Sequence, residues 1–284
     1  MRIFIGAAFT ALLTIPSATF GQGAGHPANW SQPAEPFKII DNIYYVGTKG
    51  LSSFLVAGPQ GHVLLDGAMP ESAPMIAANI RKLGFEPRDV KYLLINHSHY
   101  DHSGGLAELK RLTGAKLVAS RADKPDLEAG KTLSRPELEA FPAVKVDQAI
   151  GDGEQIKLGP VVLTAILTPG HTAGSTSWTT VAAGKQVLFA SSVSVAGEKL
   201  VANPDYPNVV SDFRNSFARL RTTKADIFLN FHAEGFGLEE KRAAQLAGKA
   251  DAFIDPGETR RRIDASEKDF DTELAEQTAQ AKSR

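Results

Sequence analysis

Apolar residues recur along this chain with two different periods, and each period predicts a different kind of element. Short runs rich in β-branched and aromatic residues, bounded by Gly, Asn, Asp and Pro, are typical of strands. Such runs cover residues 39–47, 52–58 and 62–68. A period of 3.6 residues over 72–84 predicts a helix, with Ser72 as its candidate N-cap and Gly84 at its end. The chain is therefore expected to begin with a β-meander followed by a helix.

The rest of the chain alternates strands with helices. A near-continuous apolar run over 89–97 predicts a strand buried on both faces, and a helix is predicted over 104–114. Further strands are predicted at 115–120, 146–150, 155–168, 175–181, 186–193 and 226–231. Further helices are predicted at 211–221, at 237–249 and from Glu258 onward, the last with apolar anchors at Ile263, Phe270 and Leu274. Two halves, each with strands and covering helices, suggest two sheets packed face to face, although periodicity alone supports only a layered α/β or α+β fold.

The composition limits the classes of protein that fit. The chain has 284 residues, 43% of them hydrophobic and 22% charged, and its formal net charge is −1. This length and apolar content suit one sizeable globular domain or two small ones. The near-zero charge gives no reason to expect nucleic acid or an anionic membrane as a partner. Because the sequence contains no cysteine, disulfides, thiolate metal ligands and a cysteine nucleophile are all excluded.

The N-terminal stretch has the anatomy of a secretory signal peptide. Arg2 precedes a short apolar run, and small residues follow at 21–24. An uncleaved membrane anchor is the alternative, but the run is too short and interrupted for a comfortable membrane span. We therefore expect a signal peptide over 1–22, a single domain over 23–284, and a mature protein in a bacterial periplasm or outside the cell. The Pro-rich stretch 26–36 is expected to form an extended arm on the body.

The stretch INHSHYDHSGG (95–105) concentrates metal-binding side chains where a predicted strand gives way to a helix. Three of the seven histidines of the chain fall here: His97, His99 and His102. Residues i and i+2 of a strand point the same way, so His97 and His99 are expected to address one point beyond the strand end. Asp101 and His102 are displaced onto the following loop and can address a second point nearby. Imidazole and carboxylate are the usual ligands of zinc, so the pattern predicts metal binding rather than a solvated polar loop.

Four ligands do not complete two zinc sites, so further histidines are needed. His171, in TPGHTAGSTSW, and His232, in FLNFHAEGFG, both follow predicted strands, where one rim of a layered fold collects its functional groups. His62 is expected to be an exposed hairpin residue and His26 to lie in the N-terminal arm, so neither is taken as a ligand. The predicted ligand sets are His97, His99 and His171 for one zinc ion, and Asp101, His102 and His232 for the other.

Three protein ligands at each site leave a coordination position open, which is typical of a catalytic rather than a structural zinc ion. Two zinc ions about 3.5–4 Å apart can hold both the attacking oxygen and the leaving group of a hydrolysis. Water bound to zinc has a pKa near 7, so a nucleophile exists at neutral pH without an activated serine or cysteine. The cluster therefore indicates a hydrolase with two Zn²⁺ per chain.

With these residues in place, the sequence resembles the metallo-β-lactamase superfamily, and within it most closely the di-zinc class B β-lactamases of the third subclass. The resemblance covers nearly the whole mature chain, including WSQPAEPFKIIDNIYYVGTKGLSSFLV, INHSHYDHSGG, TPGHTAGSTSW, VANPDYPNVVSDFRNSFARL and FHAEGFGL. It implies an αββα sandwich with the metal site at one edge between the two sheets, and it matches all six predicted ligands. It also implies hydrolysis of the β-lactam amide of penicillins, cephalosporins and carbapenems by a metal-bound hydroxide that Asp101 orients, and hence antibiotic resistance.

The strand end near residue 191 discriminates among members of this superfamily. Thioester hydrolases such as glyoxalase II often carry there an aspartate that bridges the two metals, whereas Ser191 and Ser192 stand at the corresponding Gly-Asp positions here. The other aspartates considered do not fit the bridging position: Asp205, Asp212 and Asp226. Serine at this strand end is a feature that the chain shares with the third subclass that it resembles. In that subclass, serines of this loop help to hold the substrate carboxylate. This implies that role for Ser192 and Ser194, although both can also be ordinary small residues at a strand end.

The sequence departs from the family pattern at one position, because several relatives carry aspartate at the position of Ser191. Hydrogen bonding around the metal ligands is therefore expected to differ here. The chain lacks the S-x-x-K of serine β-lactamases and the G-x-S-x-G of α/β-hydrolases, which is consistent with hydrolysis that forms no acyl-enzyme. A small-molecule β-lactam substrate and a monomer are expected. The segment 127–141 forms either part of the cleft wall or a plain surface loop.

Three other interpretations compete with this one. The first is a lactonase or a glyoxalase II-like thioesterase of the same fold in the periplasm. The second is a metal-scavenging protein without catalysis, against which the open coordination positions argue. The third is mononuclear iron chemistry, against which the six-ligand set argues.

Overall fold

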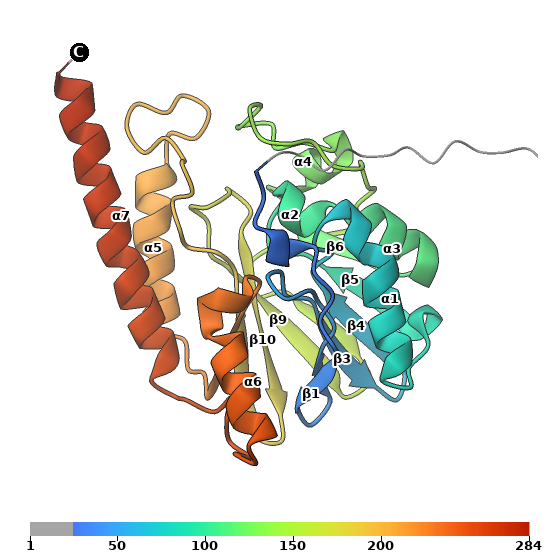
Figure 1. The fold of residues 1–284 in the computed structure, drawn as a ribbon. Coiled ribbons are helices and arrows are strands. Elements are labelled where there is room, and N and C mark those ends of the chain that lie inside the picture. The colour runs from blue at the N-terminus through green and yellow to red at the C-terminus, as the bar shows by residue number, and fades with distance from the viewer. Residues whose placement is uncertain (1–24, 284) are drawn as a thin grey trace, which may run out of the picture.

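The computed structural model describes residues 25–283, so the predicted signal peptide over 1–22 lies outside the described residues. Two β-sheets lie face to face, and helices cover their outer faces (Figure 1). The predicted αββα sandwich is therefore confirmed. Within residues 25–283, no helix combines the length and the apolar content that crossing a bilayer requires.

The first sheet has seven strands in chain order. They are β1 (Phe37–Ile40), β2 (Ile43–Tyr45), β3 (Phe54–Gly58), β4 (Gly61–Leu65), β5 (Val90–Leu94), β6 (Lys116–Ser120) and β7 (Gln148–Ile150). The first four pair antiparallel and the last four pair parallel. The single strand predicted over 39–47 is wrong, because the chain turns at Asp41, which has a φ of 44°. Aspartate tolerates this left-handed conformation better than most residues, so the DN pair within the apolar run forms a hairpin turn.

The second sheet has five strands in the order β12-β11-β10-β9-β8. They are β8 (Gln155–Leu158), β9 (Val161–Leu167), β10 (Thr176–Ala182), β11 (Lys185–Ala190) and β12 (Ile227–Asn230). The predicted strand over 155–168 is also two strands, which form an antiparallel hairpin around Gly159 at a φ of 59°. Only β11 and β12 pair parallel, and helix α5 connects them.

The helices form the two outer layers. They are α1 (Ala73–Lys82), α2 (Tyr100–Ser103), α3 (Leu106–Thr113), α4 (Lys124–Ala129), α5 (Val209–Thr222), α6 (Leu238–Leu246) and α7 (Glu258–Lys282). Helices α1 and α3 lie beside each other over the first sheet, and α5 and α7 lie over the second (Figure 1). The anchors Ile263 and Phe270 of α7 are buried, and Leu274 is partly buried, as predicted. Ser72 does precede α1, but its side chain makes no capping hydrogen bond.

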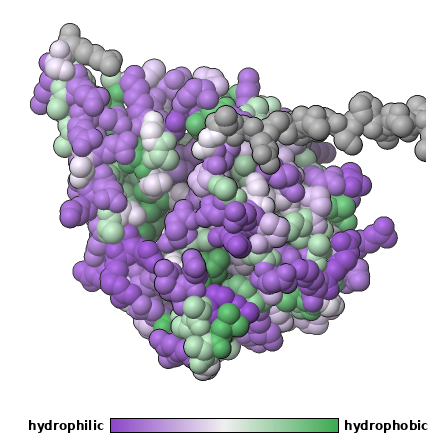
Figure 2. All heavy atoms as spheres, viewed as in Figure 1, coloured by the Kyte–Doolittle hydropathy of each residue, from purple (hydrophilic) through white to green (hydrophobic). Residues whose placement is uncertain are grey.

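The main core lies between the two sheets and is rich in aromatic side chains. Tyr45, Phe54 and Phe189 meet there, and Trp178 is fully buried with them. Polar side chains cover most of the molecular face in Figure 2, where apolar residues form only small separate patches. Burial of apolar side chains between the sheets thus stabilises the sandwich, and the loops at the strand ends can carry functional side chains.

His62 is not the exposed turn residue that the sequence predicted. It lies within β4 and is only 7% exposed, with its ring against the edge of Phe85. Its Nδ1 atom accepts a hydrogen bond from the backbone of Gly58. The turn is one residue earlier than the pattern indicated, so His62 belongs to the packed sheet.

Candidate active site

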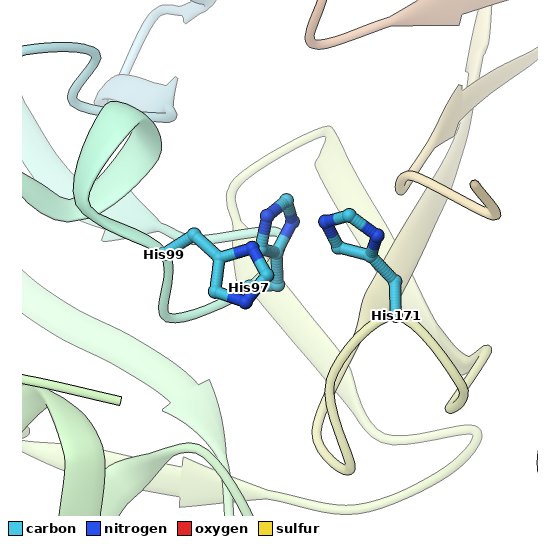
Figure 3. A group of neighbouring side chains, drawn as sticks. All are labelled: His97, His99 and His171. Atoms are coloured by element: carbon cyan, nitrogen blue, oxygen red, sulfur yellow. The ribbon is translucent and has the colours of Figure 1, made fainter. Parts of the chain in front are cut away.

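The loops after β5 and β9 bring the first three predicted ligands together. The ring centroids of His97 and His99 are 4.7 Å apart, and those of His97 and His171 are 4.5 Å apart. One nitrogen from each of these rings lies within 4.8 Å of the others. Figure 3 shows the three rings facing a common point, with His97 and His99 on one loop and His171 on the loop opposite.

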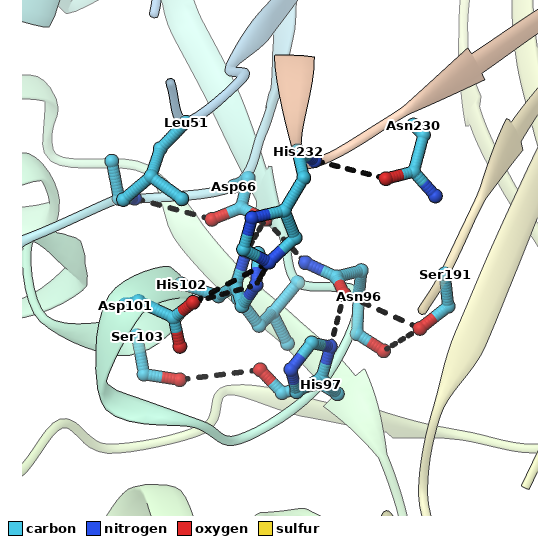
Figure 4. Close-up of polar contacts among 12 residues, drawn as sticks. Leu51, Asp66, Asn96, His97, Asp101, His102, Ser103, Ser191, Asn230 and His232 are labelled. Carbon is cyan, nitrogen blue, oxygen red and sulfur yellow. Dashed lines mark hydrogen bonds and ion pairs between the residues drawn. The ribbon is translucent and has the colours of Figure 1, made fainter. Parts of the chain in front are cut away.

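The other three predicted ligands also converge (Figure 4). The Nε2 atoms of His102 and His232 are 3.2 Å apart, and they lie 3.3 and 3.5 Å from Oδ2 of Asp101. Atoms bound about 2.0–2.1 Å from a tetrahedral zinc ion are about 3.3 Å from each other. This donor set therefore has the spacing of a metal site.

Local structure in the region 95–103 differs from the prediction. Strand β5 ends at Leu94, so His97 and His99 lie on an extended segment beyond the strand rather than on the strand itself. Asp101 and His102 lie on the one-turn helix α2 and not on a loop, so that prediction is wrong. The short helix directs these two side chains toward His232, which follows β12, and keeps the ring of His102 beside that of His97, with the centroids 4.3 Å apart.

Two glycines allow α2 to lie close to the chain that follows β4. A Cβ atom on Gly104 would collide with Pro70, and one on Gly105 would collide with the carbonyl oxygen of Gly67. These two close approaches were not predicted from the sequence. The close approach places Asp66, at the end of β4, directly behind His102.

Two of the histidines are held with their Nε2 atoms directed into the site. The Nδ1 atom of His102 donates to Oδ2 of Asp66 at 2.8 Å, and Nδ1 of His171 donates to the carbonyl oxygen of Ser194 at 2.7 Å. Carboxylate and carbonyl oxygens only accept hydrogen bonds, so the proton of each neutral ring is on Nδ1. The Nε2 atom is then free to bind a metal ion.

Asn96 extends this arrangement to His97 (Figure 4). Its Oδ1 atom accepts hydrogen bonds from Nδ1 of His97 and from the hydroxyl of Ser191, and its amide donates to Asp66. The Nε2 atoms of His97 and His99 are buried and have no hydrogen-bond partner within the protein. A buried imidazole nitrogen without a partner is costly unless a ligand satisfies it, so these atoms fit a metal ion.

Burial keeps four of the histidines neutral. It is the largest cause that lowers the pKa of His97 and His99 well below 6.5, and it lowers the pKa of His171 and His232 to about 4. Neutral imidazole is the form that binds metal, so these rings are ready for coordination at neutral pH.

His102 is the exception among the six ligands. Burial alone would lower its pKa, but the carboxylates of Asp101 and Asp66 outweigh burial and raise the pKa to about 9. Burial also opposes ionisation of Asp101, whose pKa is nevertheless held below 3.8 by His102 and His232. The two carboxylates thus make this position attractive to positive charge, whether a proton or a metal cation.

Four of the six ligands line a cleft of about 610 Å³: His99, Asp101, His171 and His232. The other two, His97 and His102, are buried beside them. The segment 127–141 contributes Arg135, Leu138 and Glu139 to the lining of the cleft, so of the two alternatives the structure supports a cleft wall. The N-terminal arm also lines the cleft and contacts this segment. There His26 stacks on Trp30 with the ring centroids 5.4 Å apart, and its Nε2 atom lies 3.0 Å from Glu139. His26 is therefore a cleft residue, although it is not among the ligands.

The serines at the end of β11 also line this cleft. Ser192 is 8% exposed, and Ser194 is exposed at the surface of the cleft. The carbonyl group of Ser194 fixes His171, a contact that the sequence did not predict. Asp212 accepts a hydrogen bond from Tyr206, and Asp226 accepts one from the backbone of Gln186, so both carboxylates are engaged elsewhere.

Three residues of the site were missed in the sequence analysis. Asp66 follows an apolar strand in HVLLDGA, the same signal that identified His97, and could have been found in that way. Asn96 precedes His97, but nothing in its position distinguishes it from an ordinary strand-end amide. Arg135 lies in a polar segment without periodicity, and only the folded chain shows that it borders the cleft.

An αββα sandwich that carries two sets of three metal-binding side chains at one edge defines a metal-dependent hydrolase. A family model for the metallo-β-lactamase superfamily matches residues 46–232, and this chain belongs to that superfamily. The resemblance stated for the sequence is therefore confirmed.

Solved structures extend the similarity to nearly the whole described chain. BJP-1, a subclass B3 metallo-β-lactamase of Bradyrhizobium japonicum, is 46% identical with a TM-score of 0.85, over 89% of this chain and 98% of that one. A metallo-β-lactamase of Cronobacter sakazakii is 42% identical with a TM-score of 0.86, over 88% and 98%. MEM-A1, a subclass B3 enzyme from a soil metagenome library, is 38% identical with a TM-score of 0.83, over 88% and 99%.

Curated relatives of another activity match only in part. A hydroxyacylglutathione hydrolase of Rhodopseudomonas palustris (strain BisB18) is 34% identical over 36% of this chain and 32% of its own length. One of Bradyrhizobium sp. (strain ORS 278) is 28% identical over 56% of this chain and 53% of its own length. The chain thus spans between about a third and about half of these relatives, whereas it spans nearly all of the solved β-lactamases.

Proposed function

We propose that this protein hydrolyses the amide bond of the β-lactam ring in penicillins, cephalosporins or carbapenems, with two zinc ions held by the six ligand side chains. The observation that carries the proposal is the pair of three-ligand sets combined with Ser191 and Ser192, rather than a carboxylate, at the end of β11. The similarity to subclass B3 metallo-β-lactamases over most of the chain supports the same substrate class.

In this proposal each side chain of the site has a distinct task. Bound zinc supplies a water nucleophile with a pKa near 7 and polarises the ring carbonyl. His97, His99 and His171 hold one ion, and Asp101, His102 and His232 hold the other. Asp101 lies within reach of both sets, where its carboxylate can accept a hydrogen bond from the attacking water and orient it. Ser192 and Ser194 lie on the wall of the same cleft, where their hydroxyl groups can bind the substrate carboxylate.

Thioester hydrolysis is the second candidate, because the curated relatives are hydroxyacylglutathione hydrolases. It is the weaker one. Those matches cover only part of each relative, and Ser192 stands where the resemblance leads us to expect a bridging aspartate in such enzymes.

A substrate panel on metal-quantified mature protein tests the proposal. We expect the protein to bind two zinc ions per chain and to open nitrocefin and at least one carbapenem. Activity should vanish when a chelator removes the metal and return when zinc is added back. Efficient cleavage of lactoylglutathione or acyl-lactones with every β-lactam left intact would assign the second candidate instead.

We also propose that the protein is exported to the periplasm as a single-domain monomer and confers β-lactam resistance. The sequence pattern of residues 1–22 supports export. Fractionation of expressing cells should place the activity in the periplasm, and N-terminal sequencing should find a start near residues 21–24. Expression should raise the inhibitory concentration of a hydrolysed β-lactam, whereas the Asp101→Asn variant should not. Activity confined to the cytoplasm would contradict the export.

A further inference from the structure

A buried carboxylate behind the first set of histidines has no part in the chemistry described so far. Asp123 lies between β6 and α4 and is only 2% exposed. Its backbone N–H donates to the hydroxyl of Ser120 at 3.0 Å, which fixes the start of this turn. The carboxylate therefore occupies a defined position within the protein interior.

Hydrogen-bond donors reach Asp123 from two different loops. The hydroxyl of Thr172 donates to its Oδ2 atom at 3.1 Å, and the backbone N–H groups of Gly174 and Ser98 also donate to the carboxyl. Ser98 lies between the ligands His97 and His99, and Thr172 directly follows the ligand His171. One carboxylate thus contacts both segments that carry the first ligand set.

The contact with the second loop is close enough to require glycine. A Cβ atom on Gly174 would collide with the carboxylate of Asp123 and with the hydroxyl of Ser120. Gly174 therefore lets the loop after β9 approach the first sheet at this point. Since β5 and β6 belong to the first sheet and β9 to the second, Asp123 joins loops of the two sheets at the segments that carry the first ligand set.

We propose that Asp123 is a positioning residue of the site, whose carboxylate sets the separation between the His97–His99 segment and His171. The affinity of this ligand set for metal then depends on Asp123 although the carboxylate does not touch the ion. Metal ligands must be held within about 0.5 Å of their working geometry, and side chains behind the ligands typically change metal affinity 10- to 100-fold. The inference rests on metal binding by these histidines, as proposed above, and not on the identity of the substrate.

The groups that hydrogen-bond to the carboxylate of Asp123 are all donors, while the nearby carboxylate of Asp126 adds to the rise in its pKa. Burial raises the pKa of Asp123 to about 7, and the hydrogen bonds from Thr172, Gly174 and Ser98 oppose a further rise because they favour the ionised form. Asparagine has the same shape but no charge and only one acceptor oxygen for these donors. The Asp123→Asn substitution therefore weakens the connection between the loops without creating a cavity.

Asp126 provides a matched control. Its carboxylate accepts from the hydroxyl of Ser98 at 2.8 Å and from the backbone of Leu133 at 3.1 Å, so it holds one ligand-bearing segment and not the loop of His171. Asp126→Asn changes the same chemical group, three residues away, without cutting the connection between the sheets. Thr172→Val removes one donor of that connection and leaves Asp123 unchanged.

The test is the zinc affinity of the purified chain, measured by competition with a chromophoric chelator, together with the visible spectrum of the cobalt-substituted protein. In Asp123→Asn one of the two metal ions should bind at least 10-fold more weakly and the cobalt spectrum should change. Asp126→Asn loosens only one ligand-bearing segment, so its loss at that ion should be several-fold smaller. Thr172→Val should show a smaller loss at the same ion, and it replaces Asp123→Asn if that variant does not fold.

Two results would overturn the inference. One is wild-type affinity for both ions in Asp123→Asn and Thr172→Val. The other is an equal loss of both ions in Asp123→Asn and Asp126→Asn, which would indicate a general loss of structure. Failure of the proposed function is recognised separately. A wild-type chain that binds no zinc refutes the metal site, and one that binds zinc but opens no β-lactam refutes only the substrate.

Discussion

The Nδ1 atom of His102 lies 2.8 Å from Oδ2 of Asp66, and both side chains are about 1% exposed. Asp66 directly follows β4, whereas His102 lies in α2, which follows β5 in the sequence. This contact fixes the ring orientation and the protonated nitrogen of a predicted metal ligand. The orientation of this ligand therefore depends on Asp66, a buried residue outside the lining of the cleft.

Replacing Asp66 should weaken the second metal site. His102, Asn96 and the backbone N–H of Ala68 all donate to Asp66. In Asp66→Asn the single amide oxygen cannot accept from all three and carries no charge, so the ring of His102 is held less firmly. We expect zinc affinity to fall roughly 10- to 100-fold for one of the two ions. Chelator competition measures this, with Asp89→Asn as a control because that carboxylate is 58% exposed and pairs only with Lys91. Unchanged affinity in Asp66→Asn would show that the contact does not tune the site.

Asp101 should matter for turnover more than for folding. Asp101→Asn removes the charge that holds the second ion and the acceptor that orients the attacking water, so kcat for nitrocefin should fall at least about 100-fold. The melting temperature of the metal-free variant should stay near wild type. Glu234→Gln is the control, since this carboxylate lies 3.7 Å from His232 but is 69% exposed, and its kcat should be unchanged. Wild-type turnover in Asp101→Asn would show that the carboxylate of Asp101 has no role in catalysis.

The metal-free protein should lose stability in acid. The pKa values of His171 and His232 are lowered from 6.5 to about 4 in the folded state, so between these pH values the unfolded chain binds protons that the folded chain does not. The free energy of unfolding therefore falls as the pH drops from 6.5 toward 4. A lowering of this size corresponds to roughly 3 kcal/mol for each histidine.

Urea unfolding of chelator-treated protein between pH 4 and 7 measures this effect. The His171→Gln variant carries one fewer titrating group, so its stability should depend less steeply on pH than that of wild type. Equal pH dependence in the two proteins would mean that burial of His171 does not suppress its protonation.

Arg135 should stabilise the fold through Glu198. Its Nη1 atom donates to the carbonyl oxygen of Ala196 at 3.3 Å and lies 3.7 Å from Glu198, and the two side chains are 11% and 4% exposed. Arg135→Ala leaves the carboxylate of Glu198 buried without its cation, so unfolding should become easier by about 3 kcal/mol.

Adding Glu198→Gln to Arg135→Ala should recover part of the loss, because the second change removes the uncompensated charge. Arg111→Ala is the control, since Arg111 is 68% exposed in its pair with Glu108, and its unfolding should match wild type. Denaturant unfolding is measured on wild type, Arg111→Ala, Arg135→Ala, Glu198→Gln and the double variant. Additive effects of the two substitutions would show that Arg135 and Glu198 do not interact.

Much of the site could be predicted because its chemistry is concentrated at strand ends. His97, His171 and His232 each follow an apolar run, and the rim of a layered fold gathers such positions. The contacts of Asp66 and Asp123 could not be predicted, since they depend on which loops meet after the sheets pack. The hairpin turn at Asp41 was missed for a different reason, because the flanking apolar residues hide a two-residue turn within one run.

Each predicted metal site takes two ligands from the first sheet and one from the second. Neither half of the chain can therefore offer a complete coordination sphere before the two halves dock. Zinc would bind the native state in preference to any partly assembled one, and an ion present at 100 times its dissociation constant adds about 2.7 kcal/mol to stability. The metal supply of the compartment would then govern how much of the protein survives proteolysis, in addition to how fast each molecule turns over.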